Sequence, residues 1–193
     1  MDERIKILVN TLGALRVKED VDITDQLDSR LGGVVRAFYI ATTTAELTQA
    51  VHLAQDLRIE YLVIGAGSKV AIAKSGFPGL MIKNRSDNIK LFGIKGKVDK
   101  SGLGVEEASI EVDSGVSLNR LGNYAKQQKL KGVETVCDLT GTVGGNLYIN
   151  PELKRISNQI KVLTKTRTPD IKTSDQVKRE DIIISVVVRL KSA

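Results

Sequence analysis

The first quarter of the chain combines a helical spacing of apolar residues with a later, continuous apolar run. Residues 2–16 carry apolar side chains three or four positions apart, at Ile5, Leu8, Leu12 and Leu15. This spacing predicts an amphipathic helix that packs through one face. Residues 18–29 are polar and show no period, so we expect a connecting segment there, with 30–33 as a tight turn beside a cation. Residues 34–40 are mainly apolar and predict a strand.

A helix-capping pattern follows this strand. Thr43 and Glu46 stand three residues apart, which is the spacing of a capping box at a helix N-terminus. The helix that it predicts has an apolar face made of Leu47, Ala50, Val51, Ala54 and Leu57. His52 lies off that face, so we expect it at the surface or at the rim of a site. Because residues 61–64 form another short apolar run, the order strand, helix, strand predicts a βαβ unit.

From residue 80 onward the pattern changes to short strands separated by turns, which is typical of a mostly antiparallel lobe. A hairpin turn rich in lysine and glycine precedes residue 109, and a helix carries Leu118, Leu121 and Ala125. The strands that we expect in this part lie at 80–83, 89–94, 109–112, 160–166 and 181–190. The last of them should be central in its sheet, because its apolar run is too continuous for a half-exposed strand.

Two glycine clusters accompany these predicted elements. The first, at 65–68, follows directly after the strand at 61–64, and the second, at 141–146, lies far down the chain. Glycine-rich turns let backbone N–H groups approach an anion closely, so we interpret the two clusters as opposite walls of one phosphate-binding site. An ordinary turn is the alternative interpretation for each cluster taken alone.

Neither cluster fits the two common nucleotide-binding fingerprints. The dinucleotide fingerprint requires a third glycine where Val70 stands and then a crossover helix, but the segment 76–79, Gly-Phe-Pro-Gly, halts any such helix after a few residues. The nucleoside-triphosphate loop requires Lys-Ser or Lys-Thr after its last glycine, which neither cluster has. The sequence therefore disfavours a Rossmann fold and a triphosphate-binding loop.

Composition and charge narrow the classes of function. The 193 residues include no apolar run of membrane-spanning length and no signal peptide, so we expect a cytoplasmic protein. One cysteine, Cys137, and one histidine exclude a disulfide within the chain and a closed Cys/His zinc site. Of the net charge of +6, residues 151–193 contribute +5, from ten Lys and Arg against five acidic residues, which favours an anionic partner. Nucleic acid is disfavoured, because aromatic residues are only 4% of the chain and none follows Tyr148.

Taken in order, several motifs resemble the FAD-binding portion of UDP-N-acetylenolpyruvoylglucosamine reductase, also called UDP-N-acetylmuramate dehydrogenase. The larger group is that of vanillyl-alcohol-oxidase, or PCMH-type, flavoproteins. The matching stretches span nearly the whole chain and lie at 30–33, 43–47, 63–68, 76–80, 132–134, 141–145 with Asn150, and 183–190. The resemblance implies an α+β fold with two lobes, a small one that contains a βαβ unit and a second one that is mainly antiparallel sheet with helices.

The resemblance also implies a cofactor and its contacts. In that family, backbone N–H groups of two glycine-rich loops hold the pyrophosphate of FAD, and NADPH is the reductant. The residues that it implies contact FAD are Gly65, Ala66, Gly67, Ser68, Gly141, Thr142, Gly144 and Gly145. We also predict Lys69, Asp138 and Thr140, in or beside the same loops, as FAD-binding residues. We expect one FAD-binding module over 1–193, with an N-terminal helix at 2–16, lobe one at about 17–84 and lobe two at about 85–193, and no metal.

Departures from the family pattern bear on activity. Lys69 stands where the family usually has Asn, and Asp138 stands where the family has a Gly before the second cluster. The Tyr-Arg pair that meets substrate in the family has no counterpart at 171–180. The family would continue past Ala193 into a third domain that binds the nucleotide sugar and carries a serine proton donor and a glutamate. Because the family reaction needs a positioned acid, we expect FAD binding without self-sufficient reductase activity.

Three hypotheses of function follow. The first is a flavoprotein module that resembles the reductase, with a partner chain or a homo-oligomer completing it. The second is an active NAD(P)H-dependent flavin oxidoreductase of unknown substrate. The third is a non-enzymatic interaction protein that has kept the fold and lost FAD, for which Lys69 and Asp138 are the motivating departures. No membrane partner is expected under any of them.

Overall fold

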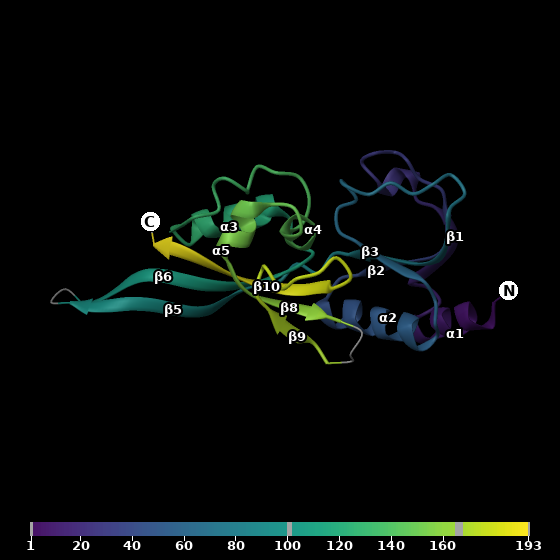
Figure 1. The fold of residues 1–193 in the computed structure, drawn as a ribbon, viewed down its shortest axis with the longest axis horizontal. Helices are drawn as coiled ribbons and strands as arrows, with labels where there is room; N and C mark the ends of the chain where they lie inside the picture. Colours follow the sequence, from purple (N-terminus) through teal and green to yellow (C-terminus); the bar gives the residue numbers. More distant parts are fainter. Residues whose placement is uncertain (1, 100–101, 165–167, 193) are drawn as a thin grey trace. The chain divides into compact units, whose positions relative to one another are not determined.

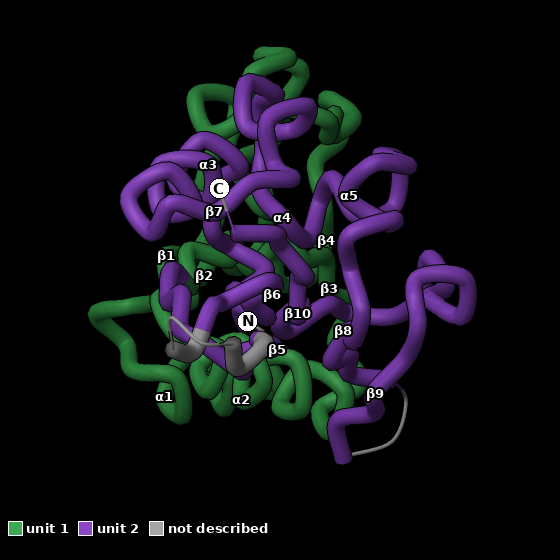
Figure 2. Tube along the Cα trace, turned by 90° about the vertical axis from the view of Figure 1, so that its left-hand side faces the viewer, with its two compact units in different colours: residues 1–86 green, residues 87–193 purple. Residues whose placement is uncertain are grey.

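The computed structural model describes residues 2–99, 102–164 and 168–192. The chain divides into two compact units, Met1–Ser86 and Asp87–Ala193, which Figure 2 shows in two colours. Each unit contains one β-sheet, and helices pack against one face of it (Figure 1). The α+β fold class is therefore confirmed.

Unit 1 contains a four-stranded sheet in the order β1-β2-β4-β3. Its elements are α1 (Glu3–Leu12), β1 (Val17–Asp22), the 3₁₀ helix η1 (Thr24–Gln26), β2 (Val34–Ala41), α2 (Thr44–Asp56), β3 (Tyr61–Ile64) and β4 (Phe77–Asn84). β2 and β3 both run parallel to β4, whereas β1 is antiparallel to β2. The predicted βαβ unit is present, with β4 inserted between its two strands.

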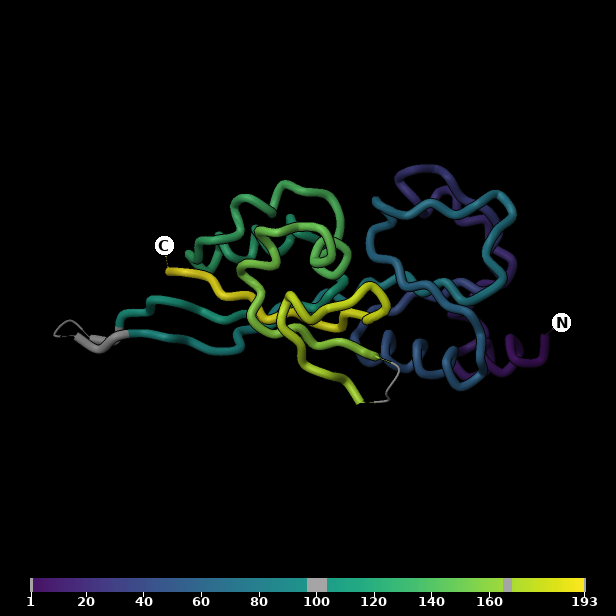
Figure 3. The backbone as a smooth tube through the Cα atoms, in the orientation of Figure 1, coloured from purple at the N-terminus to yellow at the C-terminus, as the bar shows by residue number. Residues whose placement is uncertain are grey.

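The two faces of this sheet are covered differently. α1 and α2 lie on one face, and the connecting segments between β1 and β2 and between β3 and β4 lie on the other (Figures 1 and 3). The residues buried on the segment-covered face are Ile23, Leu27, Val35, Phe38, Ile64 and Met81. Val70 and Ile72 pack against them. The first glycine cluster therefore belongs to a segment that is anchored by apolar contacts after the glycines.

Three expectations for unit 1 are wrong. α1 ends at Leu12 because Gly13 adopts a φ of 97°, so Leu15 lies in a turn and is fully exposed. The polar stretch at 18–29 contains β1 and η1; β1 is an edge strand in which only Val17 is buried, so no apolar alternation marks it. The strand expected at 80–83 is part of β4, which pairs in parallel with β2 and β3, so the antiparallel pattern expected from residue 80 onward begins only in unit 2.

The start of α2 confirms the capping prediction with one difference. Thr43 Oγ1 accepts a hydrogen bond from the backbone N–H of Glu46 at 3.2 Å. The Glu46 carboxylate accepts from the backbone N–H and hydroxyl of Thr42, at 2.8 and 2.9 Å, instead of from Thr43. It also pairs with Arg16 at 2.9 Å. Arg16 and then the Thr42 donors, against the opposing effect of burial, hold the pKa of Glu46 at about 2.

Unit 2 is an antiparallel sheet in the order β5-β6-β10-β8-β9, with β7 also paired to β10. Its elements are β5 (Ile89–Asp99), β6 (Gly102–Asp113), α3 (Leu118–Gln127), β7 (Leu130–Lys131), α4 (Val143–Leu147), α5 (Pro151–Ile156), β8 (Ser157–Leu163), β9 (Asp170–Lys172) and β10 (Ile182–Ser192). The central position of β10 is confirmed. Its buried face packs with apolar residues of α3, α4 and α5, which lie together on one side of the sheet (Figure 1).

The hairpin of β5 and β6 is longer than predicted. The lysine- and glycine-rich stretch expected as a turn is strand on both sides, up to Asp99 and from Gly102, and residues 100–101 lie outside the described part. β10 pairs with β6 only from Glu107 onward, so the outer hairpin is two-stranded among the described residues (Figure 1). The strand expected at 160–166 is β8, and its predicted last residues, 165–166, also lie outside the described part.

A buried ion pair holds the segment that leads into β10. Asp181 is 2% exposed, and its carboxylate accepts hydrogen bonds from Lys172 Nζ at 2.8 and 2.9 Å and from the backbone N–H of Lys178 at 2.7 Å. The Tyr148 hydroxyl donates to the Asp181 carbonyl. Burial, together with the Asp181 charge, raises the pKa of Tyr148 to about 12. This network joins β9, α4 and β10.

Candidate functional site

The first glycine segment leaves β3 as a turn. Residues 65–73 contain no helix, so the structure lacks the crossover helix that a dinucleotide fold would place there. The segment is tied to the chain that follows η1: the Ser29 hydroxyl donates to the Val70 carbonyl at 3.0 Å, and the Ile72 N–H donates to the Leu31 carbonyl at 2.9 Å. The position of the turn is therefore fixed by unit 1 itself.

Gly67 is required by close packing. Its φ is 91°, and a Cβ atom built on it would lie 2.5 Å from the carbonyl oxygen of Gln26. Its own carbonyl accepts from the N–H of Asp28 at 3.3 Å. The side chain of Gln26 is in turn held by the buried ammonium of Lys83, at 3.0 Å, whose pKa is lowered by burial. Gly67 thus brings the turn onto η1 at a distance that no other residue permits.

Three consecutive N–H groups of this turn are the candidate anion donors. Within the described part of the chain, the backbone N–H groups of Ala66, Gly67 and Ser68 donate no hydrogen bond. Gly67 is buried, Ser68 is partly exposed, and Ala66 and the next residue, Lys69, are exposed. Three consecutive N–H groups without a protein partner are what an anion needs.

The second glycine segment, residues 141–146, includes the N-cap and most of α4, and contacts within unit 2 hold it in place. Thr142 is the N-cap of α4, and its Oγ1 accepts from the Gly145 N–H at 3.3 Å. The amide of Asn146, which is 1% exposed, donates to the carbonyls of Thr140 and Thr142 at 3.1 and 3.0 Å. Gly141 has a φ of 105°, and its carbonyl accepts from the Leu118 N–H at 3.2 Å. Among the described residues, the N–H groups of Thr140, Gly141 and Thr142 make no hydrogen bond.

Gly144 and Gly145 differ although they are adjacent. The Gly144 N–H donates to the Ser114 carbonyl at 2.9 Å, and a Cβ on Gly144 would lie 2.8 Å from the Ser114 Cβ. Gly144 is therefore needed for contact with the turn after β6, and its N–H is already used. A Cβ on Gly145 would meet only Thr142 Oγ1, at 3.5 Å, and Gly145 is exposed. Nothing within unit 2 requires a glycine at position 145.

Sequence reasoning missed the role of Ser114. Its hydroxyl donates to the Ile183 carbonyl at 2.6 Å and its N–H to the Ile184 carbonyl at 2.9 Å, so it fastens the turn after β6 to β10. Because the Gly144 N–H rests on the Ser114 carbonyl, β10 positions the second glycine segment through this residue. The Ser-Gly pair at 114–115 marks a turn, but no local pattern indicates its long-range contacts.

Asp138 is exposed in a turn four residues before the N-cap of α4, so it does not cap that helix. Its Oδ1 lies 3.8 Å from Cys137 Sγ, within hydrogen-bond range for sulfur. Burial and the Asp138 carboxylate raise the pKa of the Cys137 thiol, which makes this cysteine a poor nucleophile.

Gly33 and Gly76 are needed where the predicted turn at 30–33 packs against residues 73–76. At both positions, backbone atoms of the opposite segment occupy the space that a Cβ would fill. His52 is half-buried, and among the described residues its Nε2 has no hydrogen-bond partner. Over the same residues, no group of acidic, histidine and cysteine side chains gathers as a metal site would require, and no helix has the length and apolarity to cross a membrane.

Solved structures of flavoproteins share this fold. UDP-N-acetylenolpyruvylglucosamine reductase from Thermus caldophilus aligns with a TM-score of 0.63 at 21% identity, over 91% of this chain and 62% of that chain. p-Cresol methylhydroxylase aligns with a TM-score of 0.64 at 12% identity, over 98% of this chain and 44% of that chain. At these identities the likeness concerns the fold, which is the PCMH-type fold predicted from the motifs.

The curated relatives compared with this chain carry the name of one enzyme. UDP-N-acetylenolpyruvoylglucosamine reductase of Clostridioides difficile (strain 630) is 27% identical over 161 residues, which are 81% of this chain and 49% of the relative. The enzyme of the same description from Caldicellulosiruptor bescii is 29% identical over 145 residues, 72% of this chain and 42% of the relative. The chain thus spans about half the length of these relatives or less.

A family model described as an FAD binding domain matches residues 35–150. This range runs from β2 in unit 1 to the N-cap of α5 in unit 2, so it contains both glycine segments. FAD is the cofactor that the match assigns. On the match, and on the fold shared with solved flavoproteins, the chain belongs to the FAD binding domain family.

Proposed function

We propose that this chain is an FAD-binding module that holds the pyrophosphate of FAD through backbone N–H groups of both glycine segments. In unit 1 the donors are Ala66, Gly67 and Ser68; in unit 2 they are Gly141 and Thr142, beside the open face of Gly145. The observation that carries the proposal is that these N–H groups have no hydrogen-bond partner among the described residues. A doubly charged pyrophosphate is best met by several oriented N–H dipoles, and these segments supply them in rigid, anchored turns.

Under this proposal, other residues support the second segment without donating to the pyrophosphate. Gly144 contacts Ser114, and the buried amide of Asn146, which was not among the predicted site residues, donates to the carbonyls of Thr140 and Thr142. These residues position the donors. Bound FAD would supply hydride-transfer chemistry, with NADPH as the reductant that the family resemblance implies; the chain's own residues would bind and orient the FAD.

We further propose that the chain by itself does not reduce the enolpyruvyl nucleotide sugar. The departures at Lys69 and Asp138, and the lack of a Tyr-Arg pair at 171–180, support this, because they fall where the related reductases meet flavin and substrate. The test is NADPH oxidation by FAD-loaded protein with UDP-N-acetylenolpyruvoylglucosamine, measured against protein without the sugar. Equal rates support the proposal. Sugar-dependent turnover overturns it and means that a residue of this chain serves as the acid.

FAD binding itself is tested by thermal unfolding with and without the cofactor. A ligand present at one hundred times its dissociation constant adds about 2.7 kcal/mol of stability. For a chain of this size, this corresponds to a rise in the melting temperature of about 5–10 °C. The proposal predicts such a shift and a flavin absorption spectrum after gel filtration. Colourless protein with an unchanged melting temperature would instead favour the hypothesis of a fold that has lost FAD.

A further inference from the structure

The sheet of unit 2 has a notch along one edge of its central strand. β8 pairs with β10 as far as Ser157 opposite Val188, and β7 pairs again from Lys131 opposite Lys191. Between these points, Arg189 and Leu190 have no partner strand on that side among the described strands. A pocket of about 380 Å³ opens at this notch, a volume typical of small-molecule sites.

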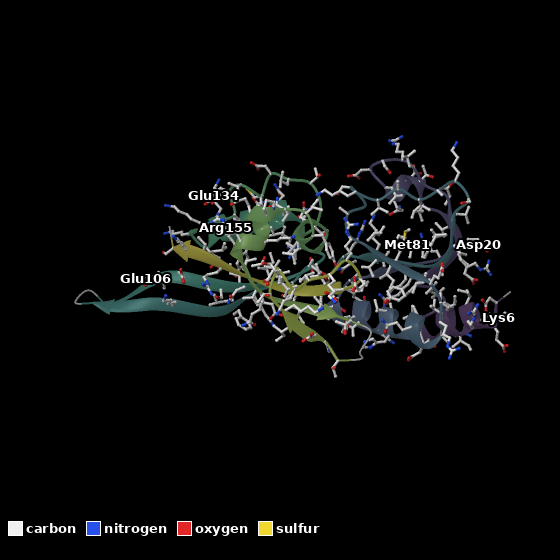
Figure 4. All side chains as sticks on the ribbon, viewed as in Figure 1. Lys6, Asp20, Met81, Glu106, Glu134 and Arg155 are labelled. Atoms are coloured by element: carbon white, nitrogen blue, oxygen red, sulfur yellow. The ribbon has the colours of Figure 1, made fainter. Side chains whose placement is uncertain are left out.

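The pocket is strongly basic. Its charged lining residues are Lys131, Arg155, Arg189 and Lys191, against a single carboxylate, Glu107. Arg155 extends from the end of α5 and is paired with Glu152 at 2.8 Å; Figure 4 labels it beside that helix. For Lys131, Arg189 and Lys191, the described residues provide no ion-pair partner.

These cations stand close together because of the strand register. Lys131 and Lys191 are directly opposite in an antiparallel pair, an arrangement in which like charges repel. Arg189 lies two residues before Lys191 and therefore on the same face of β10. Gly132, with a φ of 118°, ends β7 and leaves the notch open. Glu107 of β6 stands directly opposite Lys191 on the other side of β10 and offsets part of this repulsion. The cations around the concave site still outnumber its one carboxylate, which favours an anion there.

We propose that this pocket binds a small ligand through a diphosphate group. Arg guanidinium and Lys ammonium groups are the side chains that recognise phosphate oxygens, and several of them in one pocket favour more than one phosphate. None of the residues that line the pocket is aromatic, so it lacks the stacking platform of a single-stranded nucleic-acid site. The notch uses three of the ten basic residues of the C-terminal segment, Arg155, Arg189 and Lys191.

The pocket is separate from the second glycine segment. That segment rests on Ser114, which is bonded to β10 at Ile183 and Ile184. Arg189 lies five residues further along the same strand. At the rise of a β-strand, this is a separation of about 17 Å. A ligand at the notch therefore does not occupy the N–H groups proposed to hold FAD.

The experiment is a titration of the ¹⁵N-labelled full chain with inorganic pyrophosphate, followed by amide shifts, which locate binding, and by calorimetry. The wild type should bind saturably, with shifts at Gly132, Ser157 and Arg189. The double variant Arg189→Gln/Lys191→Gln should bind pyrophosphate at the notch at least tenfold more weakly, as followed by the shifts at these three positions. A matched control, Lys126→Gln/Lys161→Gln, removes two exposed charges of unit 2 outside the pocket and should bind within twofold of wild type.

Three results would overturn the proposal: equal weakening in both double variants, which indicates only general charge attraction; no pyrophosphate shifts at the notch; or tighter binding of a short single-stranded oligonucleotide through Arg189 and Lys191. Circular dichroism melting of each variant verifies that it is folded. Since the shifts are assigned residue by residue, failure of FAD binding at the glycine segments leaves this test intact.

Discussion

The contrast between Gly144 and Gly145 gives the sharpest prediction about the second glycine segment. Substituting alanine at position 145 adds a Cβ whose one neighbour within 4 Å is Thr142 Oγ1, at an ordinary contact distance of 3.5 Å. Because alanine is favoured over glycine inside helices by about 0.8–1 kcal/mol, Gly145→Ala should leave the free energy of unfolding unchanged or raise it by up to that amount. The new methyl group projects from the exposed side of α4.

The effect on FAD should be opposite in sign. A methyl group on the face that the pyrophosphate approaches displaces the phosphate from the N–H groups of the segment. Loss of one hydrogen bond to a charged group costs about 1.5–3 kcal/mol, which corresponds to a weakening of roughly 10- to 150-fold in the dissociation constant. Gly144→Ala is the matched control: its Cβ would lie 2.8 Å from the Ser114 Cβ, and such overpacking costs about 1–3 kcal/mol of stability.

The assay pairs urea unfolding of the FAD-free proteins with titration of flavin fluorescence. Gly145→Ala should be as stable as wild type and bind FAD weakly, whereas Gly144→Ala should be the less stable of the two variants. Wild-type FAD affinity in a folded Gly145→Ala protein would refute the assignment of this face to the pyrophosphate. Marked destabilisation by Gly145→Ala would refute the steric argument itself.

Three further predictions concern charged side chains. Asp138→Gly should tighten FAD binding several-fold because it removes a carboxylate that would repel the pyrophosphate, and Lys69→Ala should weaken binding. The FAD affinity of the double variant should lie nearer to wild type than that of Lys69→Ala. Flavin fluorescence titration measures the affinities, and unchanged or weaker binding by Asp138→Gly rules out repulsion between Asp138 and the pyrophosphate. The pKa of Glu46 is lowered from 4.5 to about 2, so the stability that its carboxylate adds to the fold is complete above about pH 4.5 and is lost as the pH falls toward 2. After allowing for solvent screening, this contribution is about 1–2 kcal/mol. Urea unfolding between pH 4.5 and pH 2 should show a smaller loss of stability for Glu46→Gln than for wild type, and equal losses would contradict the argument. Asp181→Ala should lower the free energy of unfolding by about 3–5 kcal/mol, because it leaves the ammonium of Lys172 buried without its carboxylate partner. Asp181→Ala/Lys172→Met should recover part of that loss. A loss below about 1 kcal/mol for the single variant, measured by urea unfolding, would contradict the account of the buried pair.

Short sequence patterns were sufficient to predict the elements that are marked by continuous apolar runs or by capping residues. The apolar runs of β2 and β10 and the capping residues of α2 are contained in short stretches of sequence, and the structure places all three as predicted. β1 was missed because it is held by backbone pairing with β2, from Val17 opposite Tyr39, while most of its side chains face solvent. The outer hairpin was missed for a different reason: its lysine- and glycine-rich sequence resembles a turn.

The candidate site shows a second limit of sequence patterns. Gly67, Gly144 and Gly145 look equivalent as members of glycine clusters. The structure separates them, because Gly67 packs on the Gln26 carbonyl and Gly144 on Ser114, whereas a Cβ on Gly145 would meet one side-chain atom at an ordinary contact distance. Both packing contacts join residues about 30 or more positions apart in the sequence, so no local motif could distinguish these glycines.

The central claim is that both glycine segments hold the pyrophosphate of FAD, and amide shifts on titration of the ¹⁵N-labelled chain with FAD test it most directly. The N–H groups that have no partner in the described part of the chain are the ones that should respond: Ala66, Gly67 and Ser68 in unit 1, and Gly141 and Thr142 in unit 2. The account predicts large shifts at these positions with FAD and much smaller ones with riboflavin, which has no phosphate. Saturating FAD that leaves these amides unmoved, or riboflavin that moves them as far as FAD does, would contradict it.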